Sequence, residues 1–183
     1  MDTFVPAKIF LTKGMGQHKE KLASLEQALR AARIAPYNLV KISSIFPPHC
    51  KLISRDEGIK QLTPGQILYL VMSENSTDEA HRLVSASIGL AIPNDSKRYG
   101  YLSEHHGFGQ NEKEAGQYAE DLAAYMLATT IEGDYDAGEI WDEAKSVYKI
   151  SDKIIVRTRN ITQTARGKKG MWTTVVAAAI CLP

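Results

Sequence analysis

The sequence predicts a single α+β domain in which two long helices pack on mostly antiparallel sheet. Segments 17–34 and 111–130 carry apolar residues at the spacing of amphipathic helices, and six to eight other segments have the composition or alternation of strands. The 183 residues fit one domain with a substantial core, and no linker or low-complexity run divides them. Helices packed on a layered sheet are the architecture that this pattern favours.

The N-terminal half is expected to place the first helix between strands. Gly14-Met15-Gly16 is interpreted as a tight turn before the helix of 17–34, which ends at Ala35-Pro36. The double proline Pro47-Pro48 ends the following strand, because proline has no N–H to donate to a ladder. The strands expected in this half cover residues 4–12, 37–46 and 66–73.

The C-terminal half contains the clearest strand pattern. Residues 82–92 alternate apolar with small side chains, so one face can pack closely against a second sheet or a neighbouring subunit. A further strand is expected at 99–106, before the second helix. That helix is expected to place Tyr118, Leu122, Tyr125 and Met126 on its core side. A terminal hairpin is expected from the strands 146–164 and 171–182 and the turn 166–170.

Composition argues against several functional classes. Lys and Arg total 22 against 21 Asp and Glu, without the basic excess of a nucleic-acid binder. The longest apolar stretch, 175–182, is too short to span a bilayer, and the N-terminus lacks a signal pattern. We expect a cytoplasmic protein that binds neither nucleic acid nor membrane.

Nothing in the sequence indicates a metal site. Cys50 and Cys181 are too few to form a ligand set or a disulfide framework. His105 and His106 are neighbours on an expected strand, so they point to opposite faces and do not chelate one ion together. One of them is a candidate for tuning the adjacent Glu104.

Two adjacent serines, Ser43 and Ser44, stand where a strand meets the double proline. One interpretation is structural, because serine hydroxyls commonly hydrogen-bond a turn. The other is chemical. A hydroxyl held against the preceding carbonyl can attack it to form an ester, and elimination and hydrolysis then leave a pyruvoyl group at the new N-terminus. The residues alone leave both interpretations open.

Glu104 lies late in an expected strand, among apolar and aromatic neighbours. If it is buried, its pKa rises and it can hold a proton near neutral pH, as a general acid must. The alternative is a solvated carboxylate at the end of a strand.

The segments 38–48 (NLVKISSIFPP) and 87–93 (SIGLAIP), with the segment around Glu104, resemble the pyruvoyl-dependent arginine decarboxylases, and the resemblance extends over nearly the whole chain. It implies self-cleavage between Ser43 and Ser44, giving a β chain of 1–43 and an α chain of 44–183 that begins with a pyruvoyl group derived from Ser44. It also implies a four-layer αββα sandwich. The assembly implied is a homotrimer of cleaved αβ units or a dimer of trimers, with active sites between subunits.

The same resemblance implies roles for individual residues. Asn38 matches an asparagine that assists cleavage and lies in the site, and Glu104 matches the proton donor. Glu26 falls on an acidic position, usually aspartate, associated with the substrate guanidinium, with which a carboxylate pairs in two-pronged geometry. Leu29 and Ser43 are expected to contact the substrate as well. L-Arginine would form a Schiff base with the pyruvoyl ketone, lose CO2 and leave as agmatine.

Two alternatives stay open. The first is a pyruvoyl-dependent decarboxylase of another amino acid, for example histidine, against which Glu26 favours arginine. The second is an unprocessed, non-catalytic trimeric relative on the same scaffold. The co-occurrence of Asn38, Ser43, Ser44 and Glu104 counts against it.

Overall fold

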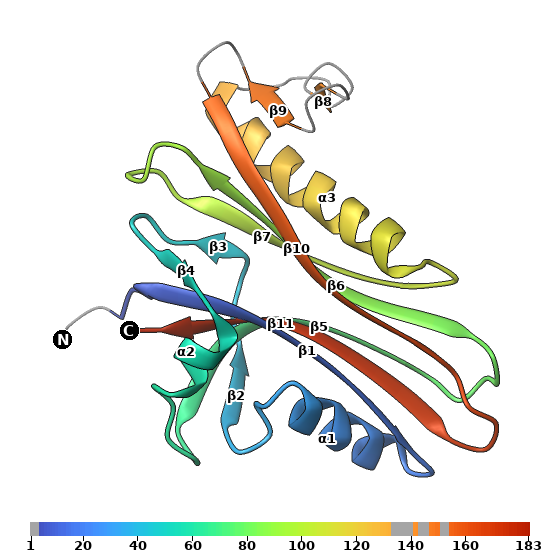
Figure 1. The fold of residues 1–183 in the computed structure, drawn as a ribbon. Helices are drawn as coiled ribbons and strands as arrows, with labels where there is room; N and C mark the ends of the chain where they lie inside the picture. Colours follow the sequence, from blue (N-terminus) through green and yellow to red (C-terminus); the bar gives the residue numbers. More distant parts are fainter. Residues whose placement is uncertain (1–3, 133–140, 143–146, 151–153) are drawn as a thin grey trace.

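The structure, a computed structural model, describes residues 4–132, 141–142, 147–150 and 154–183 and contains two sheets (Figure 1). Sheet A has five strands in the order β2-β5-β11-β1-β4, and sheet B has six in the order β3-β7-β6-β10-β9-β8. Sheet A consists of β1 (Lys8–His18), β2 (Asn38–Lys41), β4 (Lys51–Ile53), β5 (Ile67–Thr77) and β11 (Trp172–Leu182). Sheet B consists of β3 (Ile45–Phe46), β6 (Leu83–Pro93), β7 (Gly100–Phe108), β8 (Trp141–Asp142), β9 (Val147–Ile150) and β10 (Ile154–Arg166). The expected α+β class is confirmed.

Three helices accompany the sheets in the described residues. They are α1 (Lys21–Ala31), α2 (Arg55–Ile59) and α3 (Glu112–Glu132). One apolar core lies between the two sheets, and a second lies between sheet A and α1. Helix α3 packs on β6, β7 and β10, on the opposite side of the molecule from α1 (Figure 1). None of the helices in the described part of the chain is long and apolar enough to cross a membrane.

The turn expected at Gly14-Met15-Gly16 is wrong, because β1 continues through it to His18. A Cβ atom on Gly14 would lie 2.2 Å from the carbonyl oxygen of Ala28, and one on Gly16 would lie 2.2 Å from that of Ser24. These glycines therefore let the backbone of α1 approach the strand closely. They serve close packing, not a change of chain direction.

The core side expected for the second helix is wrong for its two tyrosines, whereas Leu122 and Met126 are partly buried. Tyr118 is 52% exposed and Tyr125 42% exposed. The buried residues of α3 are mainly alanines, at positions 115, 119, 123, 124 and 128. A Cβ on Gly89 would lie 2.0 Å from the carbonyl oxygen of Ala119. The small face of β6 thus receives α3, not a second sheet or a neighbouring subunit, and the close approach leaves the tyrosines outside.

The hairpin expected at the end of the chain is not formed. β10 pairs with β6 in sheet B, whereas β11 lies between β1 and β5 in sheet A. The connecting segment carries the chain from one sheet to the other, where the Gly167 amide donates to the Arg82 carbonyl at 2.8 Å. Alternation identifies a strand but not its partner. Residues 146 and 151–153 of the expected strand lie outside the described residues.

Candidate active site

The expected strand 37–46 is interrupted at the serine pair, where the chain crosses between the two sheets. Before the break, the Ile42 amide donates to the Leu70 carbonyl at 2.9 Å, at the edge of sheet A. After it, the Ser44 carbonyl accepts from the Leu102 amide at 2.8 Å, at the edge of sheet B. The Ser43–Ser44 peptide bond is therefore held from both sides, each by a different sheet.

Ser44 is the central residue of a three-residue turn. The Ile45 amide donates to the Ser43 carbonyl at 3.1 Å, an i to i+2 hydrogen bond of the kind found at strand ends. This carbonyl is the one that the Ser44 hydroxyl would attack in the self-cleavage that the family resemblance implies. The Ile45 N–H thus lies where a donor would stabilise the negative charge that develops on that oxygen.

The surroundings of the two serines favour chemistry over a purely structural role. Ser43 is exposed and Ser44 half-buried, while Phe46 and Pro47 behind them are buried. Within the described residues neither serine hydroxyl has a hydrogen-bond partner, so neither stabilises the turn as the structural interpretation requires. The segment therefore fits formation of a pyruvoyl group from Ser44.

Glu104 follows two residues after Leu102, whose amide holds the Ser44 carbonyl. The side chains of residues 102 and 104 lie on the same face of β7, the face toward sheet A, because alternate residues of a strand share a face and Leu102 belongs to the inter-sheet core. Although Glu104 is an exposed residue, partial burial of its carboxylate raises its pKa, against the opposing positive charges of Lys41 and His106. The structure thus brings Glu104 to the same crossing as Ser43 and Ser44.

Lys41 is a member of this site that the sequence analysis missed. It ends β2, two residues before Ser43, and its charge favours the ionised form of Glu104. Its Nζ lies 3.4 Å from Oε2 of Glu74 on β5. Its position within the serine motif could have indicated a role in the site. It was missed because a lysine at the end of an edge strand is ordinarily a solvated charge.

The two neighbouring histidines face opposite sides of β7, as expected. The ring of His105 packs at a tilt of 41° against that of Tyr118 of α3, with 4.3 Å between centroids, and its Nε2 lies 2.7 Å from Oε1 of Gln110. His106 acts on Glu104 instead, so it is the histidine that tunes the carboxyl group. In the described ranges no three His, Cys, Asp or Glu side chains form a group suited to a metal ion.

Cys50, close to the serine pair, is a protonated thiol. Burial raises its pKa to about 11, and burial raises that of Cys181 to about 12. A reactive cysteine requires the opposite shift. Cys50 therefore packs against the inter-sheet core as an ordinary apolar side chain.

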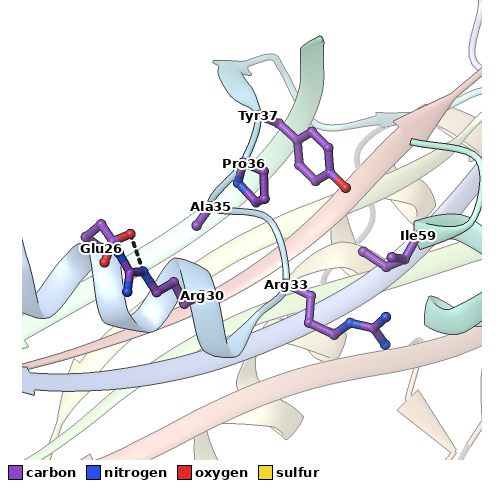
Figure 2. A pocket seen from close by; sticks show the side chains of 7 residues that line it. All are labelled: Glu26, Arg30, Arg33, Ala35, Pro36, Tyr37 and Ile59. Carbon is purple, nitrogen blue, oxygen red and sulfur yellow. Dashed lines mark hydrogen bonds and ion pairs between the residues drawn. The ribbon is translucent and has the colours of Figure 1, made fainter. Parts of the chain in front are cut away.

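Glu26 lies apart from this crossing, in a cleft of about 490 Å³ beside α1 (Figure 2). The cleft is lined by Glu26, Arg30, Arg33, Ala35, Pro36, Tyr37 and Ile59. Oε1 of Glu26 accepts from Nε of Arg30 at 2.5 Å (Figure 2). The carboxylate therefore binds a guanidinium in this structure, and that guanidinium belongs to its own helix.

Leu29 and Asn38 also lie away from the serine pair within one chain. Leu29 packs against the core between α1 and sheet A, and sheet A separates that core from sheet B. Asn38 begins β2, and its Nδ2 donates to the Gly65 carbonyl at 2.7 Å. β2 ends at Lys41, and Ser43 lies two residues beyond that end. Because an extended strand advances about 3.3 Å per residue, the length of β2 separates Asn38 from the serine pair.

Comparison with known proteins agrees with the serine motif. The family model "Pyruvoyl-dependent arginine decarboxylase" matches residues 8–183. A probable pyruvoyl-dependent arginine decarboxylase of Chlorobium phaeovibrioides is 59% identical, covering 99% of both chains. Pyruvoyl-dependent arginine decarboxylases of Nitrosopumilus maritimus and Methanosarcina acetivorans (the latter numbered 2) are 56% and 54% identical, covering 97% and 96% of both chains respectively. The resemblance is confirmed, and the chain belongs to the pyruvoyl-dependent arginine decarboxylase family.

Proposed function

We propose that this protein is a self-processing decarboxylase that converts L-arginine to agmatine and CO2. Family membership supports the activity. The observation in the structure that carries the proposal is the turn at Ser44, where the Ile45 amide is bonded to the Ser43 carbonyl. One domain of 183 residues becomes a β chain of 1–43 and an α chain of 44–183.

In self-cleavage every bond that forms or breaks belongs to the serine pair, and water is the only co-reactant. Oγ of Ser44 attacks the Ser43 carbonyl carbon, the peptide C–N bond breaks, and an ester with a free amine replaces the amide. The Ile45 N–H stabilises the oxyanion of this step. Loss of the Ser44 α-proton then expels the Ser43 carboxylate. Hydrolysis of the remaining dehydroalanine releases ammonia and leaves the ketone.

In decarboxylation, different residues act at the two ends of the substrate, the α-carbon and the guanidinium. The pyruvoyl carbonyl supplies an electron sink while CO2 leaves. Glu104 holds the proton that the α-carbon then receives, and its raised pKa suits that task. Glu26 pairs with the distal guanidinium, beside Leu29. Asn38 assists cleavage, and Ser43 contacts the substrate.

We further propose that the complete site forms between subunits of a homotrimer or a dimer of trimers. Glu26 and Leu29 lie on one side of sheet A and Glu104 on the other, so one chain does not assemble the site. Exposed apolar residues at the β2 and β5 edge offer a contact surface, including Ile67 at 60% exposure. The order of α1, sheet A, sheet B and α3 supports a four-layer αββα sandwich as the subunit fold.

The intact mass of the denatured protein tests the proposal directly. In proportion to chain length, cleavage of the 20.2 kDa chain should give fragments of about 4.7 and about 15.5 kDa. The larger fragment should be lighter, by the mass of one ammonia, than the fragment that simple hydrolysis of the Ser43–Ser44 bond would give. An arginine assay then tests the substrate. A single intact chain in active protein would contradict the proposed cofactor.

Glu26→Gln should weaken arginine binding and leave chain cleavage intact. Loss of a charged partner for the guanidinium is expected to raise KM by about 10- to 100-fold. Steady-state kinetics with arginine measure this, and Glu20→Gln on the exposed N-terminal end of the same helix serves as control. Unchanged arginine kinetics in Glu26→Gln would remove Glu26 from the guanidinium site and reopen the question of substrate.

A further inference from the structure

The segment of β7 that carries Glu104 has a strand on only one side in the described residues. β6 pairs with it along its length, but β3 reaches only Gly100 and Tyr101, and Ser44 reaches only the Leu102 amide. β7 lies second in its sheet, and beyond Leu102 no described strand of sheet B flanks it on the β3 side. On that side, the position of Glu104 relative to Ser44 therefore depends on contacts other than strand pairing.

Two polar side chains of β5 provide that contact across the gap between the sheets. Oγ of Ser73 donates to the His105 carbonyl at 2.7 Å. Nδ2 of Asn75 donates to the Gly107 carbonyl at 2.9 Å. These two carbonyls belong to the residue after Glu104 and to the residue after His106. Ser73 is only 2% exposed, beside the apolar core that lies between the two sheets.

The strand that supplies these donors is also the strand that positions the serine pair. β5 pairs with β2 up to Lys41, and the Leu70 carbonyl of β5 accepts from the Ile42 amide. One strand thus connects directly to the segment before Ser43 and to the segment around Glu104. If these two side chains only filled space, apolar side chains would give a more stable fold, because each buried polar donor must find a hydrogen-bond partner.

We propose that Ser73 and Asn75 are positioning residues that hold Glu104 in place relative to Ser44. The proposal rests on the function proposed above. A displacement of about 1 Å at a reacting group lowers turnover by roughly 100-fold, so the loss of one of these hydrogen bonds should act on turnover more than on binding.

Ser73→Ala tests the proposal, with Ser103→Ala as a matched control. Ser103 is equally buried, and its Oγ also donates to a backbone carbonyl, that of Ala119, but toward α3. We expect both variants to be cleaved and to lose similar thermal stability. Only Ser73→Ala should lower kcat, by about 10- to 100-fold with KM within about threefold of wild type. Asn75→Ala, at a less buried position, should act in the same direction.

A second readout does not depend on activity. The carboxyl carbon of Glu104 can be titrated by 13C NMR in the uncleaved Ser44→Ala background. The charges that act on it are those of Lys41 of β2 and His106 of β7, and Lys41 in turn pairs with Glu74 of β5. Because burial is the main cause of the raised pKa, a loosened β7 should move the titration toward the ordinary value of glutamate in Ser73→Ala and not in Ser103→Ala.

The outcomes separate the two claims. If kcat and the Glu104 titration respond alike to Ser73→Ala and Ser103→Ala, the positioning role is overturned. If wild-type protein does not decarboxylate arginine but the titration still moves in Ser73→Ala alone, the proposed function fails and the positioning of Glu104 stands.

Discussion

Ser44→Ala should yield one uncleaved chain of 183 residues without decarboxylase activity. The methyl side chain has no oxygen to attack the Ser43 carbonyl, so the ester cannot form and no ketone arises. The turn itself should persist, because it is made by the Ile45 amide and the Ser43 carbonyl. The denatured mass and an arginine assay on the same sample measure both consequences. Activity is expected to fall to background.

Ser43→Ala is the matched control for this prediction. It removes a hydroxyl from the same turn but leaves the attacking oxygen and the attacked carbonyl in place. Cleavage should therefore still occur. If Ser44→Ala decarboxylated arginine, the mechanism would be wrong. If Ser43→Ala alone prevented cleavage, the attacking hydroxyl would have been assigned to the wrong serine.

Local patterns predicted most of the elements but not how they pair. The segments that became α1, α3 and β6 were located by periodicity, and those that became β5 and β7 by their strand-like composition. The errors concern contacts with distant parts of the chain. Gly14 and Gly16 were interpreted as a turn because the sequence does not show that the α1 backbone lies against them. The terminal strands were paired with each other because a turn sequence joins them, and a turn sequence does not show which sheet each strand joins.

The candidate site shows the same difference between features that local sequence predicts and features that depend on distant contacts. The serine motif and Glu104 were selected by the chemistry of their side chains and by the family resemblance, and the structure brings them to one crossing between the sheets. Main-chain groups and distant residues were not predictable in this way. The Ile45 amide has no side-chain signature, and Ser73 is ordinary in its own sequence context. Its importance arises only because β5 lies across the gap from β7.

Glu104→Gln should leave cleavage complete and lower kcat by about 100- to 10,000-fold, the usual contribution of a general acid. Glutamine retains the size and polarity of the side chain but supplies no proton to the α-carbon. In the proposed mechanism the protonated form is the active one, so activity should fall as pH rises through the raised pKa of Glu104. Kinetics over a range of pH measure this decline, which is the descending limb of the pH profile. The limb should be absent from the residual activity of Glu104→Gln.

Lys41→Met provides the electrostatic control, because it removes a positive charge that favours ionised Glu104. The pKa of Glu104 should rise further, and the descending limb of activity should move to higher pH. Glu74→Gln, which removes the partner of Lys41 but neither of the positive charges that act on Glu104, should move it much less. A limb that stayed in place in Lys41→Met, or wild-type turnover in Glu104→Gln, would mean that another group donates the proton. The position of the limb therefore identifies the acid, which a loss of activity alone does not.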